Sequence, residues 1–314
     1  MTEYEAVRDG GAGLIDLSAA RGRIRVSGSE ATMFLNGLIT NDVKNLAQNR
    51  WMPAVFPTVQ GRLIGVVRVI RGNEPEFLID TETASHDAVL KTVSRFTLAG
   101  DFKVADVTSE TGLLTIQGQG AAEILAKQFE QVDLPENGVV QTNGVTIIRA
   151  SHTGEEGFDL IVDARRKAEL QQSLEAAGAQ PIGEDTFEIL RVEAGIARFG
   201  QDMDETNVVP ETNLDDAVSF TKGCYVGQEI IVRIKHRGHP AKKLTSMRFE
   251  TDQQIEPGAV IRSTENQEIG RVTSAVISPR QGSIGLGYVR YEYLADGTRV
   301  IVGDGIEAIV GTNG

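Results

Sequence analysis

The sequence predicts a mixed α+β protein that ends in an all-β domain. Up to about residue 240, segments with apolar residues at helical three-to-four spacing alternate with segments of strand-like period two. From about residue 244 the chain changes to short strand-like runs separated by glycine, a texture typical of a small antiparallel barrel or sandwich. The length of 314 residues is enough for roughly two or three domains.

The first elements follow from these two periodicities. Residues 13–27 predict a strand, because Ile24 and Val26 alternate with polar residues. A helix follows through Leu38, since apolar residues recur there at three-to-four spacing. That helix should end near residues 40–42, where Asn and Asp favour a turn.

The same patterns divide the next part of the chain. They predict a hairpin or meander over 53–80, a helix over 84–96, a strand over 111–118, a helix over about 120–130, strands over 145–150 and 158–163, and a helix over 165–177. The clearest helix spans residues 184–200, with one apolar face, acids in its first turn and glycines toward its end. No internal repeat is evident in the sequence.

The composition excludes several classes of protein. Lys and Arg number 31 against 44 Asp and Glu, and the net charge of −13 argues against nucleic-acid binding, which needs a basic surface. No segment approaches the ~20 apolar residues that cross a bilayer, and the acidic N-terminus is unlike a signal peptide. We therefore expect a soluble cytoplasmic protein with no nucleic-acid or membrane partner.

Cys224 is the sole cysteine, so an intrachain disulfide is impossible. One thiol and four histidines cannot supply a Cys₄ or Cys₂His₂ zinc site, nor the four thiolates that usually hold an iron–sulfur cluster. His236 and His239 are three residues apart, but the cations around them would repel a metal ion. We expect no metal site.

The most unusual stretch is residues 222–229, which read Lys-Gly-Cys-Tyr-Val-Gly-Gln-Glu. Two glycines flank Cys224, as they would where the backbone turns tightly or approaches a ligand closely. Lys222 is two residues from the thiol and could favour its thiolate form. A free cysteine is more often a small buried hydrophobe, so a reactive thiol and a buried one both stay open as interpretations.

Residues 222–243 are basic within an acidic chain, with six Lys or Arg residues against one acid. Such a reversal focuses a positive potential that attracts an anionic ligand or partner. In a strand, Arg233, Lys235 and Arg237 would alternate and point to one face. The alternative is a solvated strand edge, where Lys and Arg prevent unwanted pairing.

A third segment, residues 152–159, contains three carboxylates next to glycines, where a strand begins. A carboxylate can accept hydrogen bonds from the donor edge of a heterocycle through both of its oxygens. An acidic turn gives the same pattern and is the simpler interpretation. Arg191 and Glu193 on the long helix either pair with this segment or lie on a solvated face.

Together these segments resemble the YgfZ family of folate-binding proteins, a branch of the superfamily that contains the glycine cleavage T-protein. A K-G-C-Y/F-x-G-Q-E motif marks the branch, and residues 222–229 match it in full. The similarity runs along nearly the whole chain and includes residues 38–43, 153–158, 190–195 and 269–274.

The resemblance implies a three-domain ring with tetrahydrofolate in a central channel and a C-terminal antiparallel β-barrel. The implied domains are residues 1–45 with 110–185, residues 46–109 with 186–240, and residues 241–314. The implied ligand is folate in its polyglutamylated form. The implied partners are iron–sulfur client enzymes or their assembly proteins.

The resemblance also implies roles for individual residues. Cys224 would be the chemical centre beside the folate, Asp159 would hold the pterin edge, and Arg191 would lie near the folate. The basic stretch would suit the glutamate tail. The full set of expected cofactor-binding residues is Asp159, Arg191, Lys222, Tyr225, Gln228, Arg233, Lys235 and Arg237.

Two departures from the T-protein pattern bear on the reaction. The Asp that aminomethyl transfer requires is replaced by Gly65 and Val66, so we expect no aminomethyl transfer. Asp159 is one methylene shorter than the family's usual Glu, and His152 stands where the superfamily has Tyr.

The leading hypothesis is a tetrahydrofolate-binding accessory factor for the assembly or repair of iron–sulfur proteins, acting through Cys224 and linked to tRNA modification. One alternative is a folate-dependent one-carbon transferase. The other is a non-catalytic scaffold that senses folate.

Overall fold

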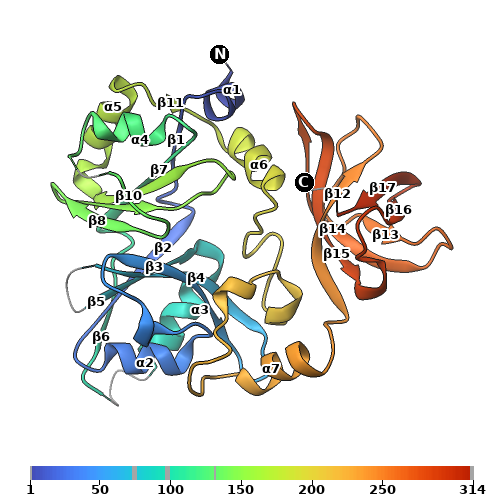
Figure 1. Cartoon of the computed structure of the whole chain (residues 1–314), viewed down its shortest axis with the longest axis horizontal. Helices are drawn as coiled ribbons and strands as arrows, with labels where there is room; N and C mark the ends of the chain where they lie inside the picture. Colours follow the sequence, from blue (N-terminus) through green and yellow to red (C-terminus); the bar gives the residue numbers. More distant parts are fainter. Residues whose placement is uncertain (1, 73–75, 96–99, 131, 312–314) are drawn as a thin grey trace.

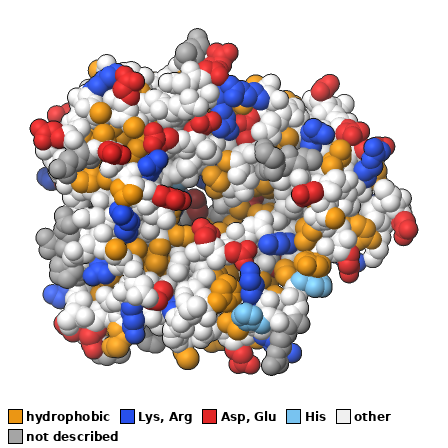
Figure 2. Space-filling view, in the orientation of Figure 1, with side chains coloured by type: hydrophobic (Ala, Val, Ile, Leu, Met, Phe, Trp, Pro, Cys, Tyr) orange, Lys and Arg blue, Asp and Glu red, His pale blue; other side chains and the backbone are white. Residues whose placement is uncertain are grey.

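The computed structural model describes residues 2–72, 76–95, 100–130 and 132–311. Two open sheets and a closed barrel are arranged around the middle of the molecule (Figure 1). The space-filling view shows a central hollow on one face (Figure 2). The expected α+β fold with a C-terminal antiparallel barrel is confirmed.

One α+β part is built on a five-stranded sheet with the order β3-β4-β5-β2-β6 among the described residues. Its strands are β2 (Arg21–Ser27), β3 (Arg50–Pro57), β4 (Leu63–Arg71), β5 (Glu76–Glu82) and β6 (Lys103–Asp106). Helices α2 (Ala31–Leu38) and α3 (Thr83–Ser94) pack their apolar faces on one side of this sheet, and η1 (Val43–Asn45) follows α2. The expected meander and both helices are confirmed, although the expected helix end at residue 96 lies outside the described residues.

The other α+β part is built on a six-stranded sheet with the order β11-β1-β7-β10-β9-β8 within the described ranges. Its strands are β1 (Gly13–Asp16), β7 (Thr111–Gln117), β8 (Val139–Thr142), β9 (Val145–Arg149), β10 (Gly157–Asp163) and β11 (Gln180–Pro181). Helices α4 (Ala121–Ala126) and α5 (Lys167–Ala176), the latter preceded by η2 (Ala164–Arg166), cover one face. The opposite face packs against α1 (Glu3–Arg8) and the other sheet.

The two sheets repeat one arrangement. The units β2-α2-β3-β4-β5-α3 and β7-α4-β8-β9-β10-α5 have the same element order and the same positions in their sheets. The strand that precedes each unit is exchanged, since β1 pairs with β7 and β6 pairs with β2. The repeat was not evident from the sequence, because the two units share a pattern of buried positions and single glycines but no run of identical residues. Gly28 and Gly118, at φ +119° and +133°, are one such pair of glycines.

Helix α6 (Glu184–Glu193) is shorter than the helix expected over 184–200. Gly195, at φ +68°, turns the chain away after the helix ends. The following segment contains the short turns η3 (Val209–Glu211) and η4 (Asp215–Ala217) and packs on Val55 and Leu63 of the five-stranded sheet.

The strand expected around residues 233–237 is wrong, because these residues lie in helix α7 (Gln228–Arg237). The apolar residues decide the local structure. Ile230, Ile231 and Ile234 recur at helical spacing, and Ile231 is buried against the segment that follows α6. In a helix, side chains two residues apart point in directions about 160° apart, so Arg233 and Lys235 do not share a face.

The C-terminal barrel closes in the order β12-β15-β14-β13-β16-β17. Its strands are β12 (Lys242–Phe249), β13 (Val260–Arg262), β14 (Glu268–Ser278), β15 (Gly282–Arg290), β16 (Arg299–Val302) and β17 (Ile306–Val310), with η5 (Tyr291–Tyr293) after β15. Strand β14 packs against α6, which fastens the barrel to the two sheets.

Sheet membership differs in one place from the domains that we expected. Of residues 1–45, β1 joins the six-stranded sheet, whereas β2 and α2 belong with the five-stranded sheet. We propose that the domain borders follow the two sheets, which assigns β2 and α2 to the same domain as β3, β4 and β5. No helix in the described part of the chain is long and apolar enough to span a membrane.

Candidate functional site

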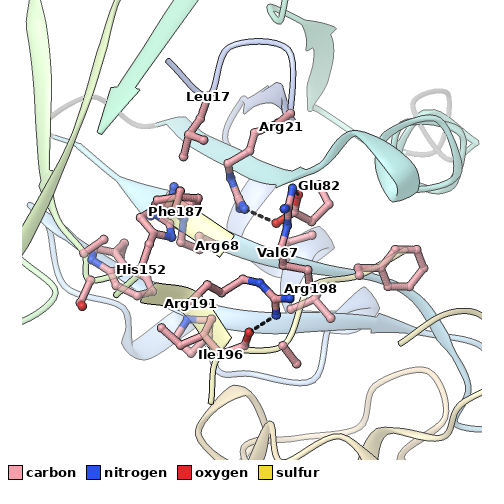
Figure 3. Close-up of a pocket in the computed structure, with 18 residues that line it drawn as sticks. Leu17, Arg21, Val67, Arg68, Glu82, His152, Phe187, Arg191, Ile196 and Arg198 are labelled. Carbon is pink, nitrogen blue, oxygen red and sulfur yellow. Dashed lines mark hydrogen bonds and ion pairs between the residues drawn. The ribbon is translucent and has the colours of Figure 1, made fainter. Parts of the chain in front are cut away.

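A cavity of about 200 Å³ lies between the two sheets, α6 and the segment that follows α6. Trp51, Val66 and Phe187 contribute to its apolar lining. Its charged and titratable lining residues are Arg21, Arg68, Glu82, His152, Arg191 and Arg198 (Figure 3). Small-molecule sites are typically hollows with apolar walls and a few polar groups, so this cavity is the candidate site.

A buried charge network joins the cavity to both sheets. Arg68 on β4 lies 2.6 Å from Asp80 on β5 and 2.5 Å from Asp159 on β10. Arg21 forms a second ion pair with Asp80 at 2.7 Å, and His152 Nε2 is 3.0 Å from both carboxylate oxygens of Asp159. Burial would raise the pKa of Asp159, but His152 and Arg68 outweigh it and hold that pKa well below its ordinary value. Asp159 is fully buried and does not line the cavity, but its partners Arg68 and His152 do. Asp159 therefore influences the cavity by holding these two side chains in place.

The other two carboxylates of the 152–159 segment are also paired. Glu155 lies 2.8 Å from Arg8, and Glu156 lies 3.1 Å from Arg149. Neither carboxylate is among the described residues that line the cavity. The expected contact between this segment and a pterin edge therefore stays a prediction, and it concerns Asp159.

Arg191 lies in the cavity wall, where it was expected, but its guanidinium is used within the protein. Its Nη1 is 2.7 Å from an oxygen of Asp202, and its Nη2 donates to Ser274 Oγ on the barrel strand β14 at 2.9 Å. A third partner is Glu188, one helical turn earlier. Burial would lower the pKa of Arg191, yet Glu188 and Asp202 outweigh it and raise that pKa. Arg191 thus fastens the barrel to α6.

Arg198 is the cavity cation with the loosest pairing. The closest carboxylate oxygens that its Nη atoms meet among the described residues belong to Glu82 and Glu188, both at 3.8 Å. Its side chain is 32% exposed. Such a guanidinium can donate hydrogen bonds to a carboxylate of a ligand without breaking a short ion pair. This role was not predicted from the sequence, because Arg198 fell within the expected end of a helix.

Strand β4 carries the two residues that replace the expected Asp. A Cβ on Gly65 would lie 2.6 Å from Val89 of α3, so position 65 faces that helix. Val66 lines the cavity, which makes this wall apolar. Among the described lining residues, Glu82 is the only carboxylate, and it lies 2.7 Å from Arg21.

Lys222 anchors the cysteine motif to the end of α2. Its Nζ donates to the carbonyl oxygens of Asn36, Ile39 and Asn41 at 2.6, 2.9 and 2.7 Å. It also lies 5.0 Å from the centroid of the Tyr225 ring, and burial lowers the pKa of Lys222 to about 8. An ammonium has three donors, and all three are used here, so Lys222 is a structural clamp.

The residues around Gly227 fix the other end of the motif. Gly227 adopts φ +78°, and a Cβ there would lie 2.4 Å from the carbonyl oxygen of Thr58. Tyr225 is buried, and burial raises the pKa of its hydroxyl to about 12. Gln228 is half-buried and begins α7. The motif therefore packs on α2 and on the turn that contains Thr58.

Cys224 is exposed, which excludes its interpretation as a buried hydrophobe. The described cavity lining contains no residue of 222–228, so the expected position of Cys224 beside the cavity is not observed. The anchors at Lys222 and Gly227 account for this placement. In the described part of the chain, no group of three or more His, Cys, Asp or Glu side chains could hold a metal ion.

The cations of α7 do not form one basic face. Lys235 lies 2.9 Å from Asp215, and Arg233 is exposed. The side chain of Arg237 lies outside the part that the structure describes. No described residue of α7 lines the cavity, and binding of a glutamate tail by these cations stays a prediction.

Comparisons with known proteins agree with this architecture of an α+β part and a C-terminal barrel. Residues 1–222 match the family model described as GCVT N-terminal domain, and residues 242–308 match the glycine cleavage T-protein C-terminal barrel domain. An aminomethyltransferase of Listeria monocytogenes serotype 4b (strain F2365) is 30% identical over 311 residues, which covers 96% of this chain and 84% of that protein. An aminomethyltransferase of Thermoanaerobacter pseudethanolicus is 28% identical over 313 residues, with the same coverage of both chains.

A solved structure shares the fold along the whole chain. The crystal structure of glycine cleavage system aminomethyltransferase T from Bartonella henselae superposes with a TM-score of 0.92. It covers 99% of this chain and 87% of its own, at 24% sequence identity.

Proposed function

This chain belongs to the glycine cleavage T-protein family, and we propose that it binds tetrahydrofolate in the central cavity. Tetrahydrofolate joins a partly reduced pterin through an aminobenzoyl group to glutamate, so it presents an aromatic end and a dicarboxylate end. The apolar walls at Trp51, Val66 and Phe187 suit the aromatic end. Arg198 suits the dicarboxylate end.

The loose pairing of Arg198 is the observation that carries the proposal. The other three arginines of the cavity are held by carboxylates at 2.5–2.7 Å, whereas Arg198 meets its acids at 3.8 Å. A ligand carboxylate would complete its pairing. Asp159 contributes in this proposal by fixing Arg68 and His152, which would meet the heterocycle from the lining.

Calorimetric titration with tetrahydrofolate tests the proposal. We expect saturable binding that Arg198→Met weakens at least about tenfold, because a hydrogen-bonded charge pair contributes about 1.5–3 kcal/mol. Lys235→Met is the matched control, since Lys235 is a cation already paired with Asp215, and binding should stay within about twofold of wild type. No saturable binding at millimolar ligand would overturn the proposal. Loss of binding in Lys235→Met but not in Arg198→Met would move the carboxylate site to α7.

Two finer functions are compatible with a folate site. Folate-dependent one-carbon transfer is favoured by the relatives, which are named aminomethyltransferase. Within this cavity the acid for such a reaction would be Glu82, because Gly65 and Val66 provide none on β4. Glu82→Gln should then abolish tetrahydrofolate-dependent ammonia release from an aminomethylated carrier protein, while leaving folate binding intact.

The YgfZ-type role in iron–sulfur protein assembly or repair is the second candidate. The observation in its favour is the exposed thiol of Cys224 in a segment anchored at Lys222 and Gly227. The relatives named above are aminomethyltransferases, so this role depends on the motif. In cells that lack the native gene, Cys224→Ala should fail to restore iron–sulfur enzyme activity, whereas full rescue would remove Cys224 from the mechanism.

One pair of assays separates the two functions. Ammonia release by the wild-type protein supports one-carbon transfer, and its absence together with failed rescue by Cys224→Ala supports the iron–sulfur role. Folate binding without ammonia release, combined with full rescue by Cys224→Ala, would favour the non-catalytic scaffold.

A further inference from the structure

A second cavity of about 820 Å³ lies between the barrel and residues 200–207, and we propose that it binds a small multivalent anion. The ligand class is an organic phosphate or an oligocarboxylate, held by Lys242 and Arg290 with a hydrogen bond from Tyr288. This cavity shares no described lining residue with the folate cavity. The proposal therefore stands apart from the proposed function.

Two cations face each other in this cavity. Lys242 on β12 and Arg290 on β15 are direct partners in an antiparallel pair, and both line the cavity. Directly opposed side chains of a pair lie about 5 Å apart at Cβ, and like charges there are destabilising. Within the described ranges, neither side chain has a carboxylate partner within 4.0 Å. A bound anion would turn this repulsion into two ion pairs.

The hydroxyl of Tyr288 provides the second, independent observation. Tyr288 lies two residues before Arg290 on the same strand, so their side chains share one face. The residue is 7% exposed, and its hydroxyl has no hydrogen-bond partner in the described structure. A buried hydroxyl without a partner costs about 1–3 kcal/mol, which a ligand acceptor would recover.

The protonation of Tyr288 makes it a donor. Burial raises the pKa of its hydroxyl, and the carboxylates of Glu211, Asp202 and Asp204 raise it further. The phenol therefore stays protonated at physiological pH and can donate to an anion. Lys242 Nζ lies 4.8 Å from the centroid of the Tyr288 ring, which brings the ammonium to the same side of the barrel.

The acids that line this cavity are already engaged. Asp202 is paired with Arg191 at 2.7 Å. Asp204 accepts hydrogen bonds from the backbone and side chain of Thr206 at 2.8 and 2.6 Å. Glu268 lies 3.2 Å from Arg271. The charges of the described lining that form no ion pair are the carboxylate of Asp204 and the cations Lys242 and Arg290. The cations exceed the carboxylate by one, so an anion is the ligand that balances the cavity.

Titrations of the full-length protein with pyrophosphate and, separately, with tri-γ-glutamate test this site. Calorimetry at low salt should show saturable binding of at least one of these probes, and thermal unfolding should shift upward with it. Lys242→Met and Arg290→Met should each weaken binding at least about tenfold, because each removes a charge-assisted contact. Binding of pyrophosphate alone identifies a phosphate ligand, and binding of tri-γ-glutamate alone identifies an oligocarboxylate.

Two further variants separate a ligand site from a structural role. Tyr288→Phe should weaken binding about fivefold without loss of stability, since it removes a hydroxyl that has no partner in the protein. Lys243→Met is the matched control, because Lys243 is the neighbouring cation on the opposite face of β12, near Asp215. No saturable binding of either probe at millimolar concentration would overturn the proposal. Equal binding by wild type, Lys242→Met and Arg290→Met would overturn it as well.

Discussion

Replacing Gly227 by alanine should destabilise the protein strongly, while the same change at Gly223 should not. Both glycines flank Cys224 in one motif, but their environments differ. Gly227 adopts φ +78°, and a Cβ there would lie 2.4 Å from the carbonyl oxygen of Thr58. Gly223 does not have a positive φ, and a Cβ there would meet no atom within 4 Å.

The magnitude follows from two costs at Gly227. An L-residue in the left-handed region costs about 1–2 kcal/mol. Forcing an extra carbon into a tight contact typically costs a further ~1–3 kcal/mol, and the contact here is with backbone, which cannot rotate away. We therefore expect Gly227→Ala to lower the free energy of unfolding by about 3 kcal/mol. Gly223→Ala should change it by less than about 0.5 kcal/mol, because nothing is displaced.

Urea unfolding followed by tryptophan fluorescence measures both changes. Trp51 is the only tryptophan, and it lies on β3 of the sheet against which the motif segment packs. The midpoint should shift for Gly227→Ala with the slope unchanged, as expected for a change in stability alone. Equal midpoints for the two variants would refute the reasoning, because they would mean that the Thr58 contact does not constrain the motif.

The buried carboxylates and the cysteine motif give three further expectations. Burial would raise the pKa values of Asp80 and Asp159, but ion pairing lowers both in the folded state. The stability that these carboxylates contribute is therefore present above their ordinary pKa of 3.8 and is lost as the pH falls below it. Urea midpoints measured at decreasing pH check this. Asp159→Asn should make the midpoint depend less on pH and should lower the free energy of unfolding by about 3 kcal/mol at neutral pH, because Arg68 loses a buried partner. Lys222→Met should lower the free energy of unfolding by about 2–3 kcal/mol in the same assay, because it leaves three carbonyl oxygens of the α2 terminus without their donor. Cys224→Ser should change stability by less than about 0.5 kcal/mol while abolishing labelling by a thiol reagent, since the side chain is exposed.

Periodicity was enough to predict most of the fold. The meander, α2, α3 and the barrel were all expected, because their apolar residues recur at the spacing of the element that they form. The prediction was wrong at α7, where the alternation of Arg233, Lys235 and Arg237 suggested a strand, whereas Ile230, Ile231 and Ile234 have helical spacing. Apolar burial decides secondary structure at such a segment, and exposed charges follow it.

The candidate site was harder to predict, because its contacts join distant parts of the chain. Arg191 was expected at the cavity, and it lies there, but its pairing with Ser274 depends on where the barrel docks. Arg198 and Arg68 carried no local signal. Arg198 was hidden in an expected helix end, and Arg68 sits in a strand whose periodicity suggested only a sheet. A sequence shows which residue types are present, whereas long-range pairing decides which cations remain available to a ligand.

The cysteine motif separates into a part that the fold requires and a part that it does not. Lys222 clamps α2, Tyr225 fills a core, and Gly227 permits the close approach of Thr58. Gly223 and Cys224 are exposed and satisfy no packing or backbone constraint. A rigid frame that ends in an exposed thiol beside an unconstrained glycine is the arrangement expected where another molecule approaches the thiol closely. Substituting Gly223 by a bulky residue should therefore impair any function of Cys224 without lowering stability, and an equal loss of both would assign the whole motif to the fold.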